Sequence, residues 1–580
     1  MDKVVNFNDV QALSIALTKM ASVTDSPGEK SFPAYLASLL QQIPYFKEHV
    51  GNIETFAIPG DEKERSNLFA LAQGSGKACV VLTGHYDVVQ TSMYGSLEPW
   101  AFDPETLLKK MESLSPRKGE DDRAYAQGSS MSKLVNDLDS GEFLPGRGIL
   151  DMKSGLAAGI SVLARFSAPL ERKGNLLFVA VADEEGSSHG MKAAAAMLPR
   201  YLKEKGLSPS VIINLDAAVD QENGESGRAV FTGSVGKLLP FVYFIGKCSH
   251  AGAPFDGINP VLAASEFARE IECNPDFLQE RQSSPGEEPP PPTILYFRES
   301  RQHYDVTTPD SVFCAMNILT HSKTPEEVLD LVGKAAFEAM NKSISTLRER
   351  ASTMARRVSG HFSIPARAPL MLSFEELASL AERTSPGIVD KIRGYAISKC
   401  PEDQVQQTLV ALRELVPFSN IEGPAVITGF TPPYYARAEI DQGRDLDFVT
   451  SLRAELLEFS QATGKSIRVR PFFPGISDMS FLSPADTAEQ RAFVRRQSVV
   501  LDSSSSEETR VSIGCPVINA GPWGRDYHQM GERINTEYGF RELPELLWRL
   551  VNASLRHAES AGSAEDSDGA EHTAGAGNKA

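Results

Sequence analysis

The sequence predicts an α/β protein whose main domain is built on a mainly parallel sheet with helices on both faces. Three observations lead to this prediction. Apolar runs of strand length alternate with longer segments of helical periodicity in the first part of the chain. Polar residues follow the ends of these runs, where the loops of a parallel sheet gather ligands. Near residue 233 the pattern changes to that of a smaller α+β module, inserted before the main domain is complete.

Two helices are predicted at the start of the chain, at residues 8–22 and 31–41, because apolar residues recur there with a helical period. Residues 78–83 form an apolar run of the length of a buried strand. The segment 91–145 is long and largely polar. We expect surface loops with a short helix there, and a loop of this length usually has a function.

Helices and strands then alternate. A helix rich in small residues is expected at 155–166, where it can pack closely on a sheet, and an alanine-rich helix is expected at 191–205. Buried strands are expected at 175–182 and 211–215. This order predicts parallel strands joined by crossover helices.

The inserted module is expected to span residues 233–370. Strands at 238–246 and 311–319 and helices at 259–271 and 325–350 indicate a sheet with helices on one face. Such a module forms a unit of its own, so it divides the main domain into two segments.

The main domain is expected to comprise residues 1–232 and 371–557. In its second segment helices dominate 373–415. The tail, residues 558–580, has no apolar period and is expected to be disordered. The strands expected in the second segment lie at 425–430, 467–473 and 516–520.

The composition favours a small-molecule substrate over a nucleic acid. The formal net charge is -18, and lysine and arginine form no basic stripe of the kind that phosphate binding needs. The start of the sequence does not resemble a signal peptide, and no apolar run approaches the about 18 residues of a membrane span. The six cysteines show no paired spacing, as in a reducing compartment. We expect a cytoplasmic protein that binds neither nucleic acid nor membrane.

Several residues with metal-binding or proton-transfer side chains follow the predicted strands and turns. Two imidazoles and several carboxylates form the ligand set expected of zinc, or of manganese or cobalt, and they are more than one tetrahedral ion can bind. The sequence therefore predicts a site for two metal ions. The residues are His85, Asp87, Asp151, Glu184, Glu185, Asp216 and His528.

Spacing assigns roles to some of these residues. Positions i and i+2 of a strand share a face, so Asp87 can reach the second nitrogen of His85 and fix its tautomer. Adjacent Glu184 and Glu185 point apart on an extended chain, so one can bind metal while the other takes a proton from water. Simpler explanations exist for isolated residues: Asp151 also suits the first turn of a helix, and the acidic pair also suits a solvated turn.

Short motifs carry these residues in order over most of the chain. They are Gly84-His85-Tyr86-Asp87, Trp100 to Pro104, Gly146-Arg147-Gly148 to Lys153, Glu184-Glu185-Gly186, Asp216, Ser249 to Pro254, Gly475-Ile476-Ser477-Asp478, and His528 with Glu532. Together they resemble the motifs of the co-catalytic zinc amidohydrolases and peptidases. That family includes aminoacylase, acetylornithine deacetylase, succinyl-diaminopimelate desuccinylase and the glutamate carboxypeptidases.

The resemblance implies a catalytic domain that holds two divalent metal ions. Zinc is the expected metal, with cobalt or manganese as alternatives. Asp151 would bridge the ions, and Glu184 would act as general base. We interpret the glycines that flank Asp151 as backbone clearance around metal. The remaining ligands would be His85 and Asp216 for one ion and Glu185 and His528 for the other.

The same resemblance implies that the inserted module is a lid and dimerisation domain and that the protein is a homodimer. His250 would then reach the active site of the partner subunit and steady the oxyanion. Without the family, His250 is an ordinary loop or core histidine. The expanded 91–145 segment and the motifs Thr307 to Asp310 and Asn317 to His321 look most like the RocB-type arginine-utilisation subgroup.

We therefore expect a metal-dependent amidohydrolase or metallopeptidase that cleaves an amide or peptide bond of a small amino-acid derivative in arginine utilisation. A serine hydrolase is disfavoured for want of a nucleophile elbow. A nucleophilic Cys248 is also disfavoured, because closeness to His250 in sequence is not the geometry that activates a thiol. The more serious alternative is a non-catalytic, metal-binding accessory protein of amino-acid metabolism.

Overall fold

The chain forms two compact units. The computed structural model describes residues 5–574 except 115–129, 279–286, 300, 302–304, 363, 366, 402, 442 and 502–512, and beyond residue 558 it describes only the backbone. The first unit comprises Met1–Ser234, Ala438–Pro484 and Glu507–Ala580, and the second comprises Val235–Arg437 and Ala485–Ser506. In the described part of the chain, no helix is both long and apolar enough to cross a bilayer.

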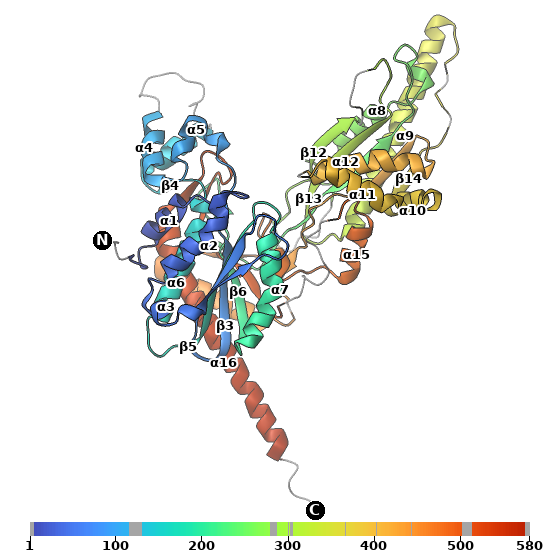
Figure 1. Ribbon diagram of the computed structural model, residues 1–580. Coiled ribbons are helices and arrows are strands. Elements are labelled where there is room, and N and C mark those ends of the chain that lie inside the picture. The colour runs from blue at the N-terminus through green and yellow to red at the C-terminus, as the bar shows by residue number, and fades with distance from the viewer. Residues whose placement is uncertain are drawn as a thin grey trace, which may run out of the picture. The chain divides into compact units, whose positions relative to one another are not determined.

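An eight-stranded sheet forms the centre of the first unit (Figure 1). The strands β5, β3, β6 and β18 run parallel to one another, and β1 and β2 extend the sheet by antiparallel pairing. The predicted mainly parallel sheet is therefore confirmed. In order across the sheet, its strands are β1 (Ile53–Ala57), β2 (Ser66–Ala72), β5 (Lys173–Val181), β3 (Ser75–His85), β6 (Ser208–Asn214), β18 (Val517–Asn519), β8 (Ala229–Phe231) and β17 (Arg468–Arg470).

Helices cover both faces of this sheet. Alternate strand residues such as Val80 and Leu82 point into one large core that also contains apolar side chains of α1, α2, α6, α13 and α16. Helix α7 covers the other face, and Figure 1 shows α6 and α7 on opposite sides of β3 and β6. The helices are α1 (Val10–Lys19), α2 (Pro27–Leu40), α6 (Ser154–Ser167), α7 (His189–Glu204), α13 (Leu446–Thr463) and α16 (Leu543–Ala574).

The small residues of α6 permit its close approach to the sheet, as the sequence predicts. A Cβ added to Gly155 would lie 2.2 Å from the carbonyl oxygen of Leu215, far closer than packed atoms approach. The glycine therefore sets the distance between α6 and the segment that follows β6.

A second, smaller sheet joins parts of the first unit that are distant in sequence. Its central strand β20 pairs with β4 on one side and with β19 on the other, and β19 also pairs with β7. The sequence predicts none of these strands, because two or three residues are too few to show a period. The strands are β4 (Phe143–Pro145), β20 (Arg533–Asn535), β19 (Trp523–Arg525) and β7 (Ala218–Val219).

The segment 91–145 is more ordered in its described parts than the expected surface loops. It contains η2 (Ser92–Trp100), α4 (Pro104–Leu114), α5 (Ser130–Ser140) and β4. Tyr94, Leu97 and further apolar residues of these helices form a small core of their own. The long segment is therefore a helical subdomain of the first unit, although residues 115–129 lie outside the described part.

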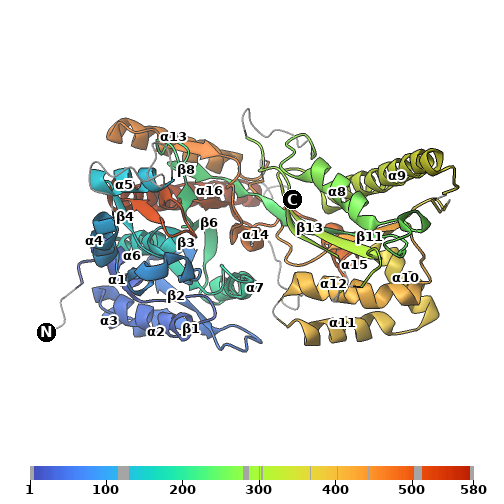
Figure 2. The same cartoon turned by 90° about the horizontal axis from the view of Figure 1, so that it is seen from above.

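The second unit contains a six-stranded sheet with helices on both faces. Figure 2 shows α8 and α9 on one side of β13 and α11 and α12 on the other. The strands follow the order β10-β13-β11-β15-β14, with β12 also paired to β13. They are β10 (Gly236–Leu238), β11 (Pro240–Ile245), β12 (Thr293–Glu299), β13 (Ser311–Thr320), β14 (Leu370–Ser373) and β15 (Ala425–Phe430). The helices are α8 (Pro260–Ile271), α9 (Pro325–Val358), α10 (Phe374–Thr384), α11 (Ile388–Lys399), α12 (Gln404–Leu415) and α15 (Ala488–Arg496).

The second unit extends beyond the expected bounds of 233–370. Strand β15, expected in the main domain, pairs along its whole length with β11 of the second unit. Helices α10 and α12 cover the sheet face that was expected to be open, where Phe241 and Tyr243 pack against Phe374 and Leu412. The helical period of 373–415 is therefore real, but it does not show which sheet the helices cover.

The end of the chain also differs from the expected disorder. Helix α16 continues through residue 558 to Ala574, and residues 575–580 lie outside the described part. The alanine and glutamate residues of this segment have high helix propensity, although they lack an apolar period.

Candidate metal centre

The carboxyl ends of three adjacent parallel strands carry four of the candidate residues. His85 is the last residue of β3, beside Val181 at the end of β5. The turn after β5 carries Glu184 and Glu185, and Asp216 lies two residues beyond β6. Because parallel neighbours end at the same edge of a sheet, these side chains gather there.

The small sheet brings two further candidates to the same place. Asp151 lies in the turn after β4, and His528 lies in the hairpin loop between β19 and β20. The pairing of Pro145 with Arg533 joins these two segments. Asp216 lies just before β7, which pairs with β19. The small sheet therefore connects three of the segments that carry candidate residues.

Asp151 lies between the two candidate histidines. Its Oδ1 is 3.1 Å from Nε2 of His85, and its Oδ2 is 3.2 Å from Nε2 of His528. Oε1 of Glu185 lies 2.9 Å from the same nitrogen of His528. Each oxygen of one carboxylate therefore faces a different imidazole, which is the arrangement of a ligand that bridges two ions.

The donor set fits divalent cations. Oε2 of Glu184 and Oδ1 of Asp216 each lie 3.9 Å from Nε2 of His85. Imidazole nitrogen and carboxylate oxygen are ligands that zinc, manganese and cobalt accept. The groups whose donor atoms lie within 4.8 Å of one another are His85 with Asp151 and Asp216, His85 with Glu184 and Glu185, and Asp151 with Glu185 and His528.

The centre concentrates negative charge in a buried place. Burial raises the pKa of Glu184 and of Asp216 well above the usual carboxyl range, and neighbouring carboxylates raise both further. Burial also acts to raise the pKa of Asp151, but hydrogen bonds from the two imidazoles lower it below its usual range. Burial acts to lower the pKa of His528, but its carboxylate partners raise it to about 10. Bound divalent cations would balance this negative charge, as protonated imidazoles do.

Asp87 contacts further groups besides the imidazole that the sequence predicts. Nδ1 of His85 donates to the backbone carbonyl of Asp87 at 3.0 Å and lies 3.6 Å from the carboxylate Oδ1. The carboxylate of Asp87 also accepts the backbone N–H groups of Glu184 and Glu185, at 3.0 and 3.1 Å. The hydroxyl of Thr24 donates to the same carboxylate at 3.0 Å. Asp87 therefore holds His85 mainly through its main chain, and its side chain positions the turn with both glutamates.

Asn519 is a positioning residue that sequence reasoning missed. Its Oδ1 accepts the backbone N–H of Asp216 at 3.1 Å, and its Nδ2 donates to the carbonyl of Asp216 at 2.9 Å. Asn519 ends β18, beside the end of β6. Its place at a strand end is the same signal that identified Asp216, so the sequence could have revealed it.

The turn before Asp151 is shaped by packing. Gly148 has a φ of 74°, and an added Cβ would lie 2.3 Å from Cγ1 of Val88. The peptide bond between Asp151 and Met152 is cis. The space that Gly148 provides is therefore occupied by Val88, which corrects its interpretation as clearance around metal.

Asp478 is a further carboxylate, to which the sequence assigns a motif but no role. Both of its carboxylate oxygens are buried, without a hydrogen-bond partner in the described part of the chain. Burial raises the pKa of Asp478 to about 7, and His85 acts against this rise while Asp87 adds to it. Asp478 thus adds to the acidic groups whose charge bound cations would balance.

The sequence does contain a match to the serine nucleophile motif, which corrects the argument against a serine hydrolase. Gly186, Ser188 and Gly190 have the Gly-x-Ser-x-Gly spacing, from the turn after β5 to the start of α7. Ser188 is only 1% exposed, so its hydroxyl does not face solvent where a substrate could reach it. Burial, rather than absence of the motif, argues against this serine as a nucleophile.

His250 belongs to the second unit, on an exposed segment that follows β11. Its Nδ1 accepts the backbone N–H of Gly252 at 3.0 Å, and the segment pairs His250 with Thr307. Nε2 is then the nitrogen that carries the proton and can donate to a ligand. The role of His250 stays a prediction, because the other candidate residues belong to the first unit.

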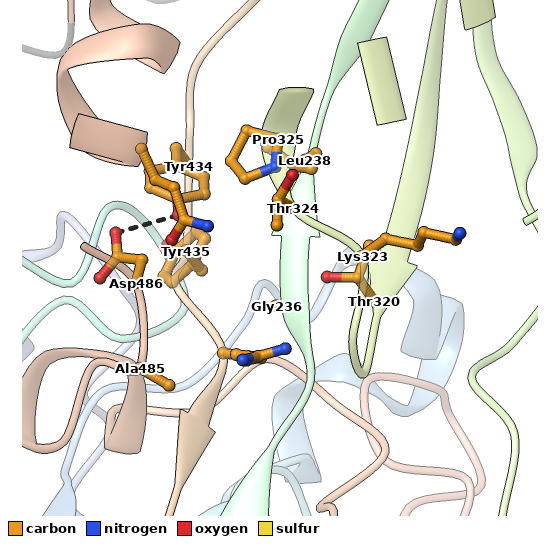
Figure 3. Close-up of a pocket in the computed structure, with 12 residues that line it drawn as sticks. Gly236, Leu238, Thr320, Lys323, Thr324, Pro325, Tyr434, Tyr435, Ala485 and Asp486 are labelled. Atoms are coloured by element: carbon orange, nitrogen blue, oxygen red, sulfur yellow. Dashed lines mark hydrogen bonds between the residues drawn. The ribbon is translucent and has the colours of Figure 1, made fainter. Parts of the chain in front are cut away.

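A hollow within the second unit is too small for a substrate. It lies beside β10 and the start of α9, where the hydroxyl of Tyr434 donates to Asp486 at 3.0 Å (Figure 3). Its volume of about 30 Å³ has room for water but not for an amino-acid derivative. This hollow is therefore not a substrate site.

Comparison with known families identifies the chain. The family model described as peptidase family M20/M25/M40 matches residues 81–498. The chain belongs to this family. As an M20 family member it is a metal-dependent amidohydrolase or metallopeptidase, which confirms the expected class of enzyme. The match covers all the candidate residues except His528, which lies beyond its end.

Two full-length relatives of this M20 family member come from Bacillus subtilis. The uncharacterized protein YqjN is 30% identical over 571 residues, which cover 96% of this chain and 98% of YqjN. Protein RocB is 29% identical over 560 residues, 93% of each chain. The expected likeness to RocB-type proteins is thus confirmed. Among solved structures, a tripeptidase from Staphylococcus aureus aligns with a TM-score of 0.48 and 13% identity, covering 95% of this chain and all of the tripeptidase.

Proposed function

We propose that this protein hydrolyses an amide or peptide bond of a small amino-acid derivative and that it uses two divalent ions, with zinc as the proposed metal. The position of Asp151 carries the proposal, since its two carboxylate oxygens face two different histidines at 3.1 and 3.2 Å. Membership of the M20 family supports the reaction class. Cobalt and manganese are the alternatives for the metal, because they accept the same ligands.

The residues divide into two ligand sets that share Asp151. His85 and Asp216 would hold one ion, and Glu185 and His528 would hold the other. The close spacing of donor atoms within each set supports this division. Asp87 and Asn519 would keep these ligands in place through the backbone hydrogen bonds described above.

When bound, the ions would polarise the substrate carbonyl and lower the pKa of a water molecule from about 15.7 toward about 7. Glu184 would take a proton from the attacking water and pass it to the departing nitrogen. Burial raises the pKa of Glu184, which makes its carboxylate a stronger proton acceptor and so supports this role. Its carboxylate is positioned by the backbone contact between Glu184 and Asp87.

We propose a homodimer formed through the second unit. Strand β12 pairs only with β13 in the described part of the chain, so its other edge is open. Leu295 and Phe297 on this strand are 61% and 45% exposed. An open strand with exposed apolar side chains supports an interface there. Sedimentation velocity tests it: Phe297→Glu should produce monomers, and an unchanged dimer would place the interface elsewhere.

We further propose that His250 of one subunit donates a hydrogen bond to the oxyanion in the active site of the other. Mixing two inactive variants tests this role. Refolding His250→Ala together with Glu184→Gln should restore part of the activity, because a mixed dimer has one site with both intact residues. The absence of any recovery in verified mixed dimers would contradict a role across the interface.

The substrate is tested with a panel of N-acyl amino acids and dipeptides, with arginine derivatives among them, and with added zinc, cobalt or manganese. We place the reaction in arginine utilisation, as the resemblance to RocB-type proteins implies, so arginine derivatives should be the best substrates. We place the protein in the cytoplasm, since its six free thiols suit a reducing compartment. Stoichiometric metal binding without hydrolysis of any compound would favour the alternative, a non-catalytic accessory protein.

A further inference from the structure

We propose that the buried ion pair between Arg147 and Glu532 positions both halves of the metal centre together, with Glu532 as the central positioning residue. The proposal rests on the metal-ligand roles proposed above for Asp151 and His528. It assigns no contact with metal or substrate to either member of the pair. The segments that carry Asp151 and His528 lie more than 370 residues apart in sequence, and the pair holds them in one arrangement.

One oxygen of Glu532 organises the turn that carries Asp151. Oε1 accepts backbone N–H groups from Gly148 at 2.8 Å, Leu150 at 3.3 Å and Asp151 at 3.3 Å. These groups converge on a single carboxylate oxygen, and hydrogen bonds to a charged acceptor are stronger than those to a neutral one. The position of the Asp151 backbone is therefore set directly by Glu532.

The other oxygen of Glu532 binds Arg147. Oε2 lies 2.5 Å from a guanidinium nitrogen of Arg147, and both side chains are only 1% exposed. The guanidinium also lies over the ring of Tyr94, 5.2 Å from its centroid. Removal of one member of a buried charge pair destabilises a protein, because the remaining charge is left without a partner. The pair therefore holds the carboxylate of Glu532 in one place.

The same pair reaches the loop that carries His528. Glu532 itself lies four residues after His528, at the end of the hairpin loop. A second nitrogen of Arg147 donates to the carbonyl of Gln529 at 3.4 Å, and the N–H of Gly146 donates to the carbonyl of Glu532 at 3.2 Å. Arg147 and Glu532 each contact both segments, so the turn and the loop cannot shift independently.

This geometry predicts an effect on metal binding that a merely stabilising ion pair would not have. Displacing the Asp151 turn by a fraction of an ångström would disturb the ligand shared by both ions. Loss of a residue that orients metal ligands typically lowers metal affinity or activity about 10- to 100-fold. A pair that only stabilises the fold would instead lower the unfolding temperature and leave the affinity of the folded protein unchanged.

Glu532→Gln tests the proposal in the full-length protein, because it keeps the shape of the side chain and removes its charge. We expect cobalt affinity, measured by competition with a chelator, to fall about 10- to 100-fold. We also expect the visible spectrum of the bound cobalt to change, since the ligand geometry changes. The matched control is Asp445→Asn, which removes the charge of another buried carboxylate in the first unit, paired with Arg444. The control should keep the parent affinity and spectrum.

Parent-like cobalt affinity and spectrum in folded Glu532→Gln would overturn the proposal, as would an equal loss in Asp445→Asn. If Glu532→Gln does not fold, Arg147→Lys provides the second test. It keeps the positive charge but lacks the planar fork that contacts both Glu532 and Gln529. Its cobalt affinity should also fall, and parent-like binding would again overturn the proposal. Failure of the ligand assignment itself is distinguishable, because Asp151→Ala would then bind both ions normally.

Discussion

The two histidines beside Asp151 are held by different kinds of structure. His85 ends the 11-residue strand β3 in the middle of the main sheet, and its side chain is 2% exposed. His528 lies in a hairpin loop with a φ of 61°, and its side chain is 43% exposed. Both nevertheless approach the same carboxylate to nearly the same distance. One half of the centre is therefore fixed by sheet geometry, and the other depends on contacts across the small sheet.

The difference shows which parts of the centre depend on which contacts. On the His85 side, neighbouring strands and the side chains of Asp87 and Asn519 fix the ligands and the turn with both glutamates. On the His528 side, the buried pair of Arg147 and Glu532 positions the Asp151 turn and the His528 loop. Substitutions on the two sides should therefore have different consequences for metal content, stability and pH dependence.

The largest effect should come from Asp151→Ala, which removes the residue common to both sides. On the proposed ligand set neither ion keeps its full coordination, so we expect loss of both ions and of detectable hydrolysis. Elemental analysis after dialysis measures the metal content. The control is Glu545→Ala, which removes a half-exposed partner of Arg165 and should retain both ions. Two retained ions in Asp151→Ala would contradict the bridging role.

Glu184→Gln should lower turnover and leave the metal content unchanged. Loss of a general base typically costs about 10²- to 10⁴-fold in rate, and the amide cannot take the proton from water. The measurement is kcat with each metal beside the bound metal per protein. Parent-like kcat would remove Glu184 from the mechanism, and loss of metal would make it a ligand.

His85→Ala and His528→Ala compare the two sides directly. Each should lower the metal content from two ions to one, as measured by elemental analysis. His85 is buried and bonded to Asp87 and Asp151, so its loss should also cost the metal-free protein roughly 1–3 kcal/mol in urea unfolding. Removal of the half-exposed His528 should change that free energy far less once the pH is raised to about 10, where its ion pairs with Asp151 and Glu185 no longer contribute. Equal destabilisation by the two variants would show that the two sides are equally rigid.

The smallest effect should be a pH dependence of the metal-free protein. Burial acts to lower the pKa of His528, but its carboxylate partners raise it from 6.5 to about 10. Because the folded-state pKa lies above the unfolded value, the contribution of His528 to stability is fully present below pH 6.5 and is lost as the pH rises through about 10. The unfolding midpoints of parent and His528→Ala in chelator should therefore converge between pH 6.5 and 10. A constant difference across this range would contradict the raised pKa.

The sequence predicts the parts of the centre that depend on long, buried elements. The strands that end at His85, Val181 and Asn214 contain continuous apolar runs of buried-strand length, so the edge where they meet could be located from sequence. The strands of the small sheet have two or three residues and show no period. Their pairing, and with it the contact between the Asp151 turn and the His528 loop, depends on long-range packing that sequence spacing does not express.

Two other differences have similar causes. The carboxylate of Asp87 lies near the imidazole of His85, as its spacing predicts, but spacing could not reveal the backbone N–H groups of Glu184 and Glu185 that it accepts. The helices at 373–415 were predicted as helices, but their period does not identify the sheet face formed by Phe241 and Tyr243 as their partner. Residue patterns thus predict elements well and predict the contacts between distant elements poorly.

The pairing of β4 with β20 has a consequence for how the enzyme is made. A chain that leaves the ribosome from its amino end has Asp87 and Asp151 early, whereas His528 and β20 follow Asp151 by more than 370 residues. Until then Pro145 lacks its partner strand and Asp151 lacks the carboxylate of Glu532. On the proposed ligand set, both metal sites are therefore complete only after His528 has been synthesised, and a chain that ends before it lacks one proposed ligand and Glu532.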